Sequence, residues 1–162
     1  MIFRRNGRKV VAAAGTFSLV AVGMALAAAP AGAINANING WKASWCSASV
    51  YNWCLYYSPG GMNGGSAYLD HVGNIPSLSG YTFGTGENHN VNTPGYGQAV
   101  RNNAASMENG TPNCNVTTWV YPNYVGDFNW LSPGEGGNLS PNANDPQQLR
   151  NNEASIDLNT CS

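Results

Sequence analysis

Apolar and aromatic side chains along this chain come in short runs that Gly, Asn, Ser and Pro interrupt. Beyond residue 33, no window of the sequence shows the 3.6-residue spacing of apolar side chains that an amphipathic helix needs. Tyr and Trp are frequent in the runs and favour strands, whereas Gly and Asn favour turns. The pattern therefore predicts an all-β protein of short strands joined by many turns.

One stretch of the sequence occurs twice. The segment 97–108, GQAVRNNAASME, returns 49 positions later as PQQLRNNEASID at 146–157, and the alignment needs no gap. Both copies contain Arg-Asn-Asn-x-Ala-Ser. A repeat of this length predicts two related structural units, each of which buries its apolar face against the other.

A fainter repeat precedes each of these copies. It reads as an aromatic strand, a tight glycine turn and a second aromatic strand, followed by a long connection to Asn-Asn-x-x-Ser. An offset of 62 brings together Tyr57, Met62, Gly64 and Tyr68 in the first copy with Trp119, Tyr124, Gly126 and Trp130 in the second. Gly is expected at such a corner because a tight hairpin requires a positive φ. The sequence thus predicts two Greek keys packed as a sandwich, with Tyr57, Tyr68, Trp119 and Trp130 in the core.

The long connection differs between the two units. Gly64 to Asn102 spans 38 positions, whereas Gly126 to Asn151 spans 25, so that the surplus of 13 falls around Asp70–Pro94. Because Gly, Asn, Ser and Pro prevail there, we expect an enlarged surface loop where function specific to this protein would lie.

The first 33 residues have a pattern of their own. Four basic residues precede an apolar run from Val10 to Ala29, and Ala31-Gly-Ala33 offers a small-x-small cleavage site. This is typical of a secretory signal peptide over 1–33, and the Ala/Gly-rich run makes a membrane anchor the weaker interpretation. The mature chain, 34–162, is expected to be a single secreted, extracellular domain that no longer contacts the membrane. It keeps three cations against eight acids, which argues against nucleic acid as a partner.

Four cysteines follow the signal segment, namely Cys46, Cys54, Cys114 and Cys161. An even number in an exported chain predicts two disulfides, for which three pairings are open. Pairing Cys46 with Cys54 and Cys114 with Cys161 is preferred, because each bridge then stays within one repeat unit. In the loop-entropy model, the shorter ring contributes about 2.5 kcal/mol and the longer one about 4 kcal/mol.

These motifs resemble a known family. An aromatic residue, x4, a second aromatic residue, x and Gly, followed by Asn-Asn-x-x-Ser, is similar to the Greek-key motif of the βγ-crystallins. The early Cys pair ending in Cys54-Leu-Tyr-Tyr57, and Cys114 before the second key, further resemble secreted bacterial proteins of the Streptomyces metalloproteinase-inhibitor type, peptidase inhibitor family I36. The resemblance covers 41–161 and implies a βγ-crystallin-like sandwich with keys at about 45–109 and 114–161.

The resemblance also implies a function, although a fold by itself does not fix one. It implies a monomeric proteinase inhibitor, with no enzymatic activity of its own, whose partner is an extracellular metallopeptidase. The contact is expected in the segment between the keys, because Pro112 and Cys114 restrict its backbone and a preorganised loop loses less entropy on binding. The candidate residues are Pro112, Asn113, Cys114, Asn115 and Val116.

Calcium binding is the first alternative, since Asn-Asn-x-x-Ser resembles the βγ-crystallin calcium motif. Such a site would be weak and would use Asn102, Asn103, Ser106, Asn151, Asn152 and Ser155. Met107 and Ile156 stand where the family has a second hydroxyl, so the favoured interpretation is that Asn and Ser hold a turn. No other cofactor is expected. A calcium-dependent surface protein and a killer-toxin-like antimicrobial protein remain the alternative functions.

The remaining candidates for chemistry are weaker. His71 and His89 each lie near an acid, but two ligands on a loop seldom make a metal site. Asp127 and Glu135 could form a glycosidase pair, yet solvated acids are common in such Gly- and Asn-rich connections. The Trp and Tyr residues could stack on carbohydrate, although core positions are the favoured interpretation.

Overall fold

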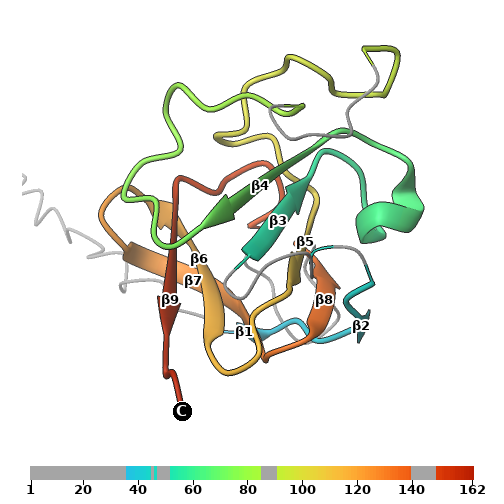
Figure 1. Cartoon of the computed structure of the whole chain (residues 1–162). Helices are drawn as coiled ribbons and strands as arrows, with labels where there is room; N and C mark the ends of the chain where they lie inside the picture. Colours follow the sequence, from blue (N-terminus) through green and yellow to red (C-terminus); the bar gives the residue numbers. More distant parts are fainter. Residues whose placement is uncertain (1–35, 45, 47–51, 85–90, 140–148) are drawn as a thin grey trace, which may run out of the picture. The chain divides into compact units, whose positions relative to one another are not determined.

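The computed structural model describes residues 36–44, 46, 52–84, 91–139 and 149–162 (Figure 1). All of them fall within one compact unit, Gly32–Ser162. Within these ranges the chain is built of strands, with one 3-10 turn, η1 (Gly61–Gly64), as the sole helical element. None of the described residues belongs to a helix long and apolar enough to cross a membrane. The predicted signal peptide, 1–33, lies outside the described residues.

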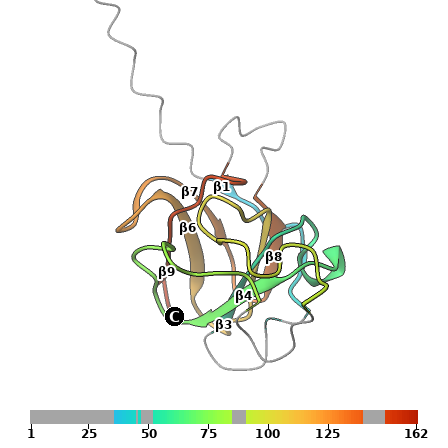
Figure 2. The same ribbon diagram turned by 90° about the horizontal axis from the view of Figure 1, so that it is seen from above.

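The strands form two sheets, which Figure 2 shows from above. The first sheet has the order β2-β8-β5-β3-β4, with β2 at Trp41–Lys42, β8 at Glu135–Asn138, β5 at Ser106–Asn109, β3 at Asn52–Tyr56 and β4 at Tyr68–Val72. The second has the order β1-β7-β6-β9, with β1 at Ala36–Asn37, β7 at Val125–Leu131, β6 at Asn115–Tyr121 and β9 at Ser155–Asn159. The inner faces share one apolar core, which includes Trp53, Leu55, Met107, Val116, Leu131 and Ile156. The predicted all-β fold is confirmed.

Each key contributes its third strand to the other key's sheet. In the second key, β8 pairs with β5 of the first key and places Gly137 opposite Met107. In the first key, the equivalent segment is a single bridge of Ile75 to Ile156. The Ile75 N–H donates to the Ile156 carbonyl at 2.8 Å, and the Ile156 N–H donates to the Ile75 carbonyl at 3.0 Å. Met107 and Ile156 are equivalent positions in the stronger sequence repeat, so the two Greek keys interlock symmetrically.

The register of the fainter repeat was predicted wrongly by one residue. The structure places Tyr56 opposite Ser106 and Trp119 opposite the equivalent serine, Ser155, so that Trp119 corresponds to Tyr56 and not to Tyr57. A shift of one residue along a strand moves every side chain to the other face. Of the four predicted core residues, Tyr57 does pack against the apolar core, and Tyr68 packs against a separate cluster around Tyr56. Trp119 and Trp130 were predicted wrongly, because they are half-buried and line the outer surface of their sheet.

The segment Asp70–Pro94 is not the surface loop that its composition predicted. It starts within β4, and Ile75, Leu78 and Phe83 are fully buried in the core. The Phe83 N–H donates to the carbonyl of Gln98 at 2.9 Å, which ties the segment to the chain just before the first Asn-Asn motif. The composition of the segment, rich in turn residues, did not reveal that these three apolar side chains belong to the core. Residues 85–90, with His89, lie outside the described residues.

The residues before the first key, which the sequence did not mark as strands, add an edge strand to each sheet. β1 pairs in parallel with β7, and β2 pairs antiparallel with β8. Between them, Asn39 accepts a hydrogen bond from the Ser132 N–H at 3.1 Å and donates one to the Ser132 hydroxyl at 3.1 Å. Gly137 permits this approach, because a Cβ there would overlap the carbonyl of Ile38.

Candidate functional site

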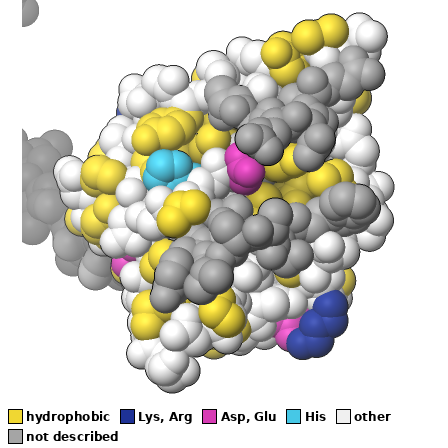
Figure 3. Space-filling model, viewed as in Figure 1, with side chains coloured by type: hydrophobic (Ala, Val, Ile, Leu, Met, Phe, Trp, Pro, Cys, Tyr) yellow, Lys and Arg dark blue, Asp and Glu magenta, His cyan; other side chains and the backbone are white. Residues whose placement is uncertain are grey.

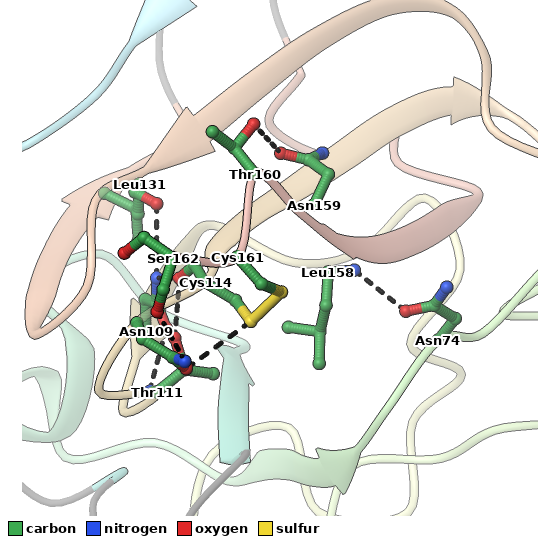
Figure 4. The surroundings of a disulfide bond; sticks show 11 residues. Asn74, Asn109, Thr111, Cys114, Leu131, Leu158, Asn159, Thr160, Cys161 and Ser162 are labelled. Atoms are coloured by element: carbon green, nitrogen blue, oxygen red, sulfur yellow. Dashed lines mark hydrogen bonds between the residues drawn. A yellow bond between two sulfur atoms is a disulfide. The ribbon is translucent and has the colours of Figure 1, made fainter.

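The predicted contact segment lies where β5 passes into β6, around a disulfide (Figure 4). The buried Asn109 amide donates to the carbonyls of Cys114, at 2.9 Å, and Leu131, at 3.2 Å. Its side-chain oxygen accepts the Thr111 N–H at 2.9 Å. The Thr111 hydroxyl lies 2.6 Å from the Cys114 carbonyl. The turn is therefore fixed from the inside by one amide and one hydroxyl.

The C-terminal residues fix the same turn from its other side. Cys114 is bonded to Cys161, and the two Cα atoms lie 4.0 Å apart. The Asn113 amide donates to the carbonyl of Ser162 at 2.9 Å, and the Ser162 N–H donates back to the Asn113 carbonyl at 3.0 Å. The other disulfide joins Cys46 to Cys54. The preferred pairing is confirmed.

Little of the predicted contact segment reaches the surface. Pro112 is exposed and Asn113 is partly exposed, whereas Cys114 is buried and Val116 belongs to the core. Asn115 begins β6 and lies on the outer face of its sheet. Alternation along β6 explains this, since successive side chains point to opposite faces.

The two Asn-Asn-x-x-Ser segments lie next to each other. The Asn102 N–H donates to the carbonyl of Glu153, and the Asn151 N–H donates to the carbonyl of Ala104, both at 2.9 Å. Asn102 and Asn151 both have φ at 58°, a left-handed conformation that Asn tolerates better than most residues. The repeated Asn thus makes a turn that contacts its own copy.

The serine of each segment holds the corner of its own key. Ser106 Oγ donates to the Ser58 carbonyl at 2.6 Å and accepts the Gly61 N–H at 3.0 Å. Ser155 Oγ donates in the same way to the Tyr121 carbonyl at 2.7 Å and accepts the Tyr124 N–H at 3.1 Å. These bonds give both hydroxyls a structural role. The weak calcium site at Asn102, Asn103, Ser106, Asn151, Asn152 and Ser155 stays a prediction, and the described residues contain no cluster of three or more His, Cys, Asp or Glu side chains suited to a metal.

Glu153 is a buried acid that sequence reasoning missed. Its carboxylate accepts the N–H groups of Asn103 at 2.7 Å and Ala104 at 2.6 Å through Oε1, and that of Asn152 at 3.0 Å through Oε2. Burial raises the pKa of Glu153 to about 7, against the opposing effect of these N–H groups. Ala104 occupies the equivalent position of the first copy, so one carboxylate joins both motif segments.

The other predicted polar candidates lie apart. His71 packs on β4 between the rings of Trp53 and Tyr81, with centroids 5.6 and 6.0 Å away, and burial lowers its pKa while Asp70 opposes the shift. Asp127 lies on β7 and Glu135 on β8, which belong to different sheets and are not the connections that we expected. Glu135 forms an ion pair with Lys42.

The outer face of the first sheet is covered by the chain itself. Glu108 is fully buried there, and it accepts hydrogen bonds from the Tyr56 hydroxyl at 2.9 Å and the Trp41 indole at 3.0 Å. Burial, and then the charge of Glu108, raise the pKa of Tyr56 above its ordinary value. The disulfide Cys46–Cys54 packs beside Tyr56. We call this surface the closed face.

The outer face of the second sheet contains a groove of about 270 Å³. It is lined by Asn115, Thr117, Trp119, Phe128, Trp130, Asn159 and Thr160. The rings of Trp119 and Phe128 lie 4.4 Å apart between centroids. The Trp119 indole donates to Asp157 at 2.9 Å, and the Asn159 amide donates to the Thr117 hydroxyl at 2.7 Å. We call this surface the open face.

Comparison with known proteins identifies the fold. No family model matches the chain, and no curated protein sequence matches it. A solved structure described as "Evolution of the eye lens beta-gamma-crystallin domain fold" is similar, with a TM-score of 0.51 over 75% of this chain and 97% of that chain. The two sequences are 14% identical, so the likeness concerns the fold. The protein has a βγ-crystallin fold of two interlocked Greek keys.

Proposed function

We propose that this chain is a secreted inhibitor of an extracellular metallopeptidase and that it presents the turn at Pro112 and Asn113 to the enzyme. The observation that carries the proposal is the bracing of this turn. Asn109 and Thr111 hold it from inside, while the disulfide to Cys161 and the bonds to Ser162 hold it from outside. A turn fixed in advance loses little conformational entropy on binding.

The chemistry of the target fits an exposed backbone turn. A catalytic zinc keeps one coordination position open for water or substrate, and a backbone carbonyl can occupy it. Pro112, exposed at the tip of the turn, restricts the backbone because its ring fixes φ. Two disulfides, and the finding that no described helix could cross a membrane, are compatible with an extracellular location.

The test is a titration of a thermolysin-type zinc endopeptidase and a subtilisin-type serine endopeptidase with the mature protein. We expect stoichiometric loss of activity for the zinc enzyme alone. Asn113→Gly removes the side-chain bond to Ser162 and should weaken inhibition by about tenfold. Tyr121→Ala, at an exposed site in the β6–β7 hairpin, is the matched control and should inhibit like the wild type. Full activity of both enzymes at excess protein would refute the proposal.

A further inference from the structure

The two keys place the same kind of side-chain pair at equivalent positions on their outer faces. Tyr56 donates to Glu108 in the first key, and Trp119 donates to Asp157 in the second. Each aromatic residue lies opposite the serine of its motif segment, Ser106 or Ser155. The β-sheet register therefore allows the two faces to be compared residue by residue.

On the closed face, the chain fills the space beside this pair. Cys54 lies between Asp70 and Glu108 across the sheet, and its disulfide to Cys46 covers that position. The Trp41 indole then donates to Glu108 from above. Residues that precede β3 therefore supply the closed face with both an apolar cover and a hydrogen-bond donor.

On the open face, the lining residues leave a groove beside this pair. Thr117 takes the position of Cys54, and it lies between Trp130 and Asp157 across the sheet. Thr117 is buried at the bottom of the groove, and Trp119 and Trp130, on neighbouring positions, give the groove aromatic walls. No residue in this lining corresponds to Trp41 or Cys46.

We propose that the open face binds a neutral oligosaccharide, with one sugar ring in the place that Trp41 and Cys46 take in the first key. The faces of the Trp119 and Trp130 rings are electron-rich, and they therefore attract the positively polarised C–H groups on one face of a sugar ring. Asn115 supplies an amide group and Thr160 an exposed hydroxyl group for sugar hydroxyls.

The charge around the groove selects a neutral ligand. Its lining contains no Lys or Arg, while the Asp157 carboxylate accepts hydrogen bonds at its edge from Trp119 and Asn159. Sialylated, sulfated or uronic sugars would bring like charge close to Asp157, which is unfavourable. Charge on the wider surface is also sparse, as Figure 3 shows for one face of the molecule.

Some side chains of the groove are held by hydrogen bonds to each other, whereas others have polar groups that a ligand can bind. The bonds from Trp119 to Asp157 and from Asn159 to Thr117 hold these side chains in place. The Trp130 indole and the Asn115 amide have no side-chain hydrogen-bond partner within the described ranges. A rigid wall with unused donors favours binding, because few side chains need to be ordered.

The test uses the indole N–H signals of the folded, mature protein in two-dimensional NMR. Chitotriose, cellotriose and mannotriose are titrated to about 10 mM, a range that detects weak binding. We expect at least one of them to shift the Trp119 and Trp130 signals. The signals of Trp41 and Trp53 should stay in place, since these side chains lie on the closed face and in the core. Trigalacturonate should bind at least about tenfold more weakly.

Two variants decide whether a shift comes from the groove. Trp130→Ala removes one wall and should weaken binding by at least about tenfold, and Thr117→Leu fills the floor and should abolish it. Tyr121→Ala, an exposed aromatic residue outside the lining, should bind normally, and an unchanged Trp53 signal reports intact folding in each variant.

Three results would overturn the proposal. The first is the absence of any shift with all three sugars, and the second is a shift that neither groove variant changes. The third is a shift that protein concentration alone produces, which would make the open face a contact between two copies. Peptidase inhibition plays no part in this experiment, so either proposal can fail while the other stands.

Discussion

The closed and open faces are equivalent surfaces of two equivalent Greek keys, yet one is filled and the other is hollow. Both carry an aromatic donor beside an acid, Tyr56 with Glu108 and Trp119 with Asp157. The difference comes from Cys46 and Trp41, which precede β3 in the chain and cover the closed face. The shared core keeps the two Greek keys alike, whereas their outer faces can differ without any change in the core.

The largest expected effect tests the disulfides of the two keys against each other. Replacing Cys114 and Cys161 by Ser should lower the free energy of unfolding by about 4 kcal/mol, because the bridge closes the longer loop. Replacing Cys46 and Cys54 should lower it by about 2.5 kcal/mol and expose Tyr56. Urea denaturation measures both. A greater loss from the shorter loop would show that covering the closed face outweighs loop entropy.

The next effect compares the two acids. Glu108→Ala leaves two donors, the Tyr56 hydroxyl and the Trp41 indole, without their acceptor in a buried site, and should cost about 3 to 4 kcal/mol. Asp157→Ala should cost about 1 kcal/mol, because water can reach the Trp119 indole from the groove. Equal losses in urea denaturation would mean that the open face is as dry as the closed one.

A pH dependence follows from the asymmetry between Glu153 and Ala104. The folded state raises the pKa of Glu153 from 4.5 to about 7, so between these values it holds more protons than the unfolded chain. Its contribution is fully present below pH 4.5 and is lost as the pH rises to about 7, by up to about 3 kcal/mol. Melting temperatures at pH 5 and pH 8 measure this. The loss should be absent in Glu153→Gln, and a wild type that is more stable at pH 8 would contradict it.

The smallest effect concerns the residues that close the sheet edges. Gly137→Ala should cost about 2 kcal/mol, since the new methyl group overlaps the Ile38 carbonyl and displaces the N-terminal residues. Gly40→Ala is the matched control, because its Cβ would meet ordinary contact distances, and it should change stability by less than about 0.5 kcal/mol. If thermal melting shows no difference between them, the N-terminal residues do not hold the edge.

The sequence predicted the parts of the fold that repeat and the parts that the cysteines join. The repeated Arg-Asn-Asn-x-Ala-Ser predicted two keys, and the cysteine positions predicted both disulfides. The alignment of the fainter repeat was wrong because the hairpin of the first key is longer than that of the second. Tyr56 lies opposite Tyr68 in the first hairpin, whereas Trp119 lies opposite Phe128 in the second, and fewer residues separate that pair. A gap-free offset cannot represent that difference, and one residue of error exchanges core and surface.

Features made by distant contacts left no local signal. Two-residue strands such as β1 and β2 are too short to show alternation. Nothing in the sequence marks Glu153, because two of its N–H donors come from the loop of the other key. The groove depends on the placement of Thr117 between Trp130 and Asp157 on the neighbouring strands, which is a property of register. Such features depend on the assembled sheets.

The exchange of third strands makes folding a single event for the whole chain. β5 has only β3 as a neighbour until β8 has been synthesised, and Ile75 has no strand partner until Ile156 follows. When only the first key has left the ribosome or a translocation channel, neither sheet can be completed. Pairing across such distances is slow, so we expect Cys114 to stay a free thiol until Cys161 and the last strand arrive.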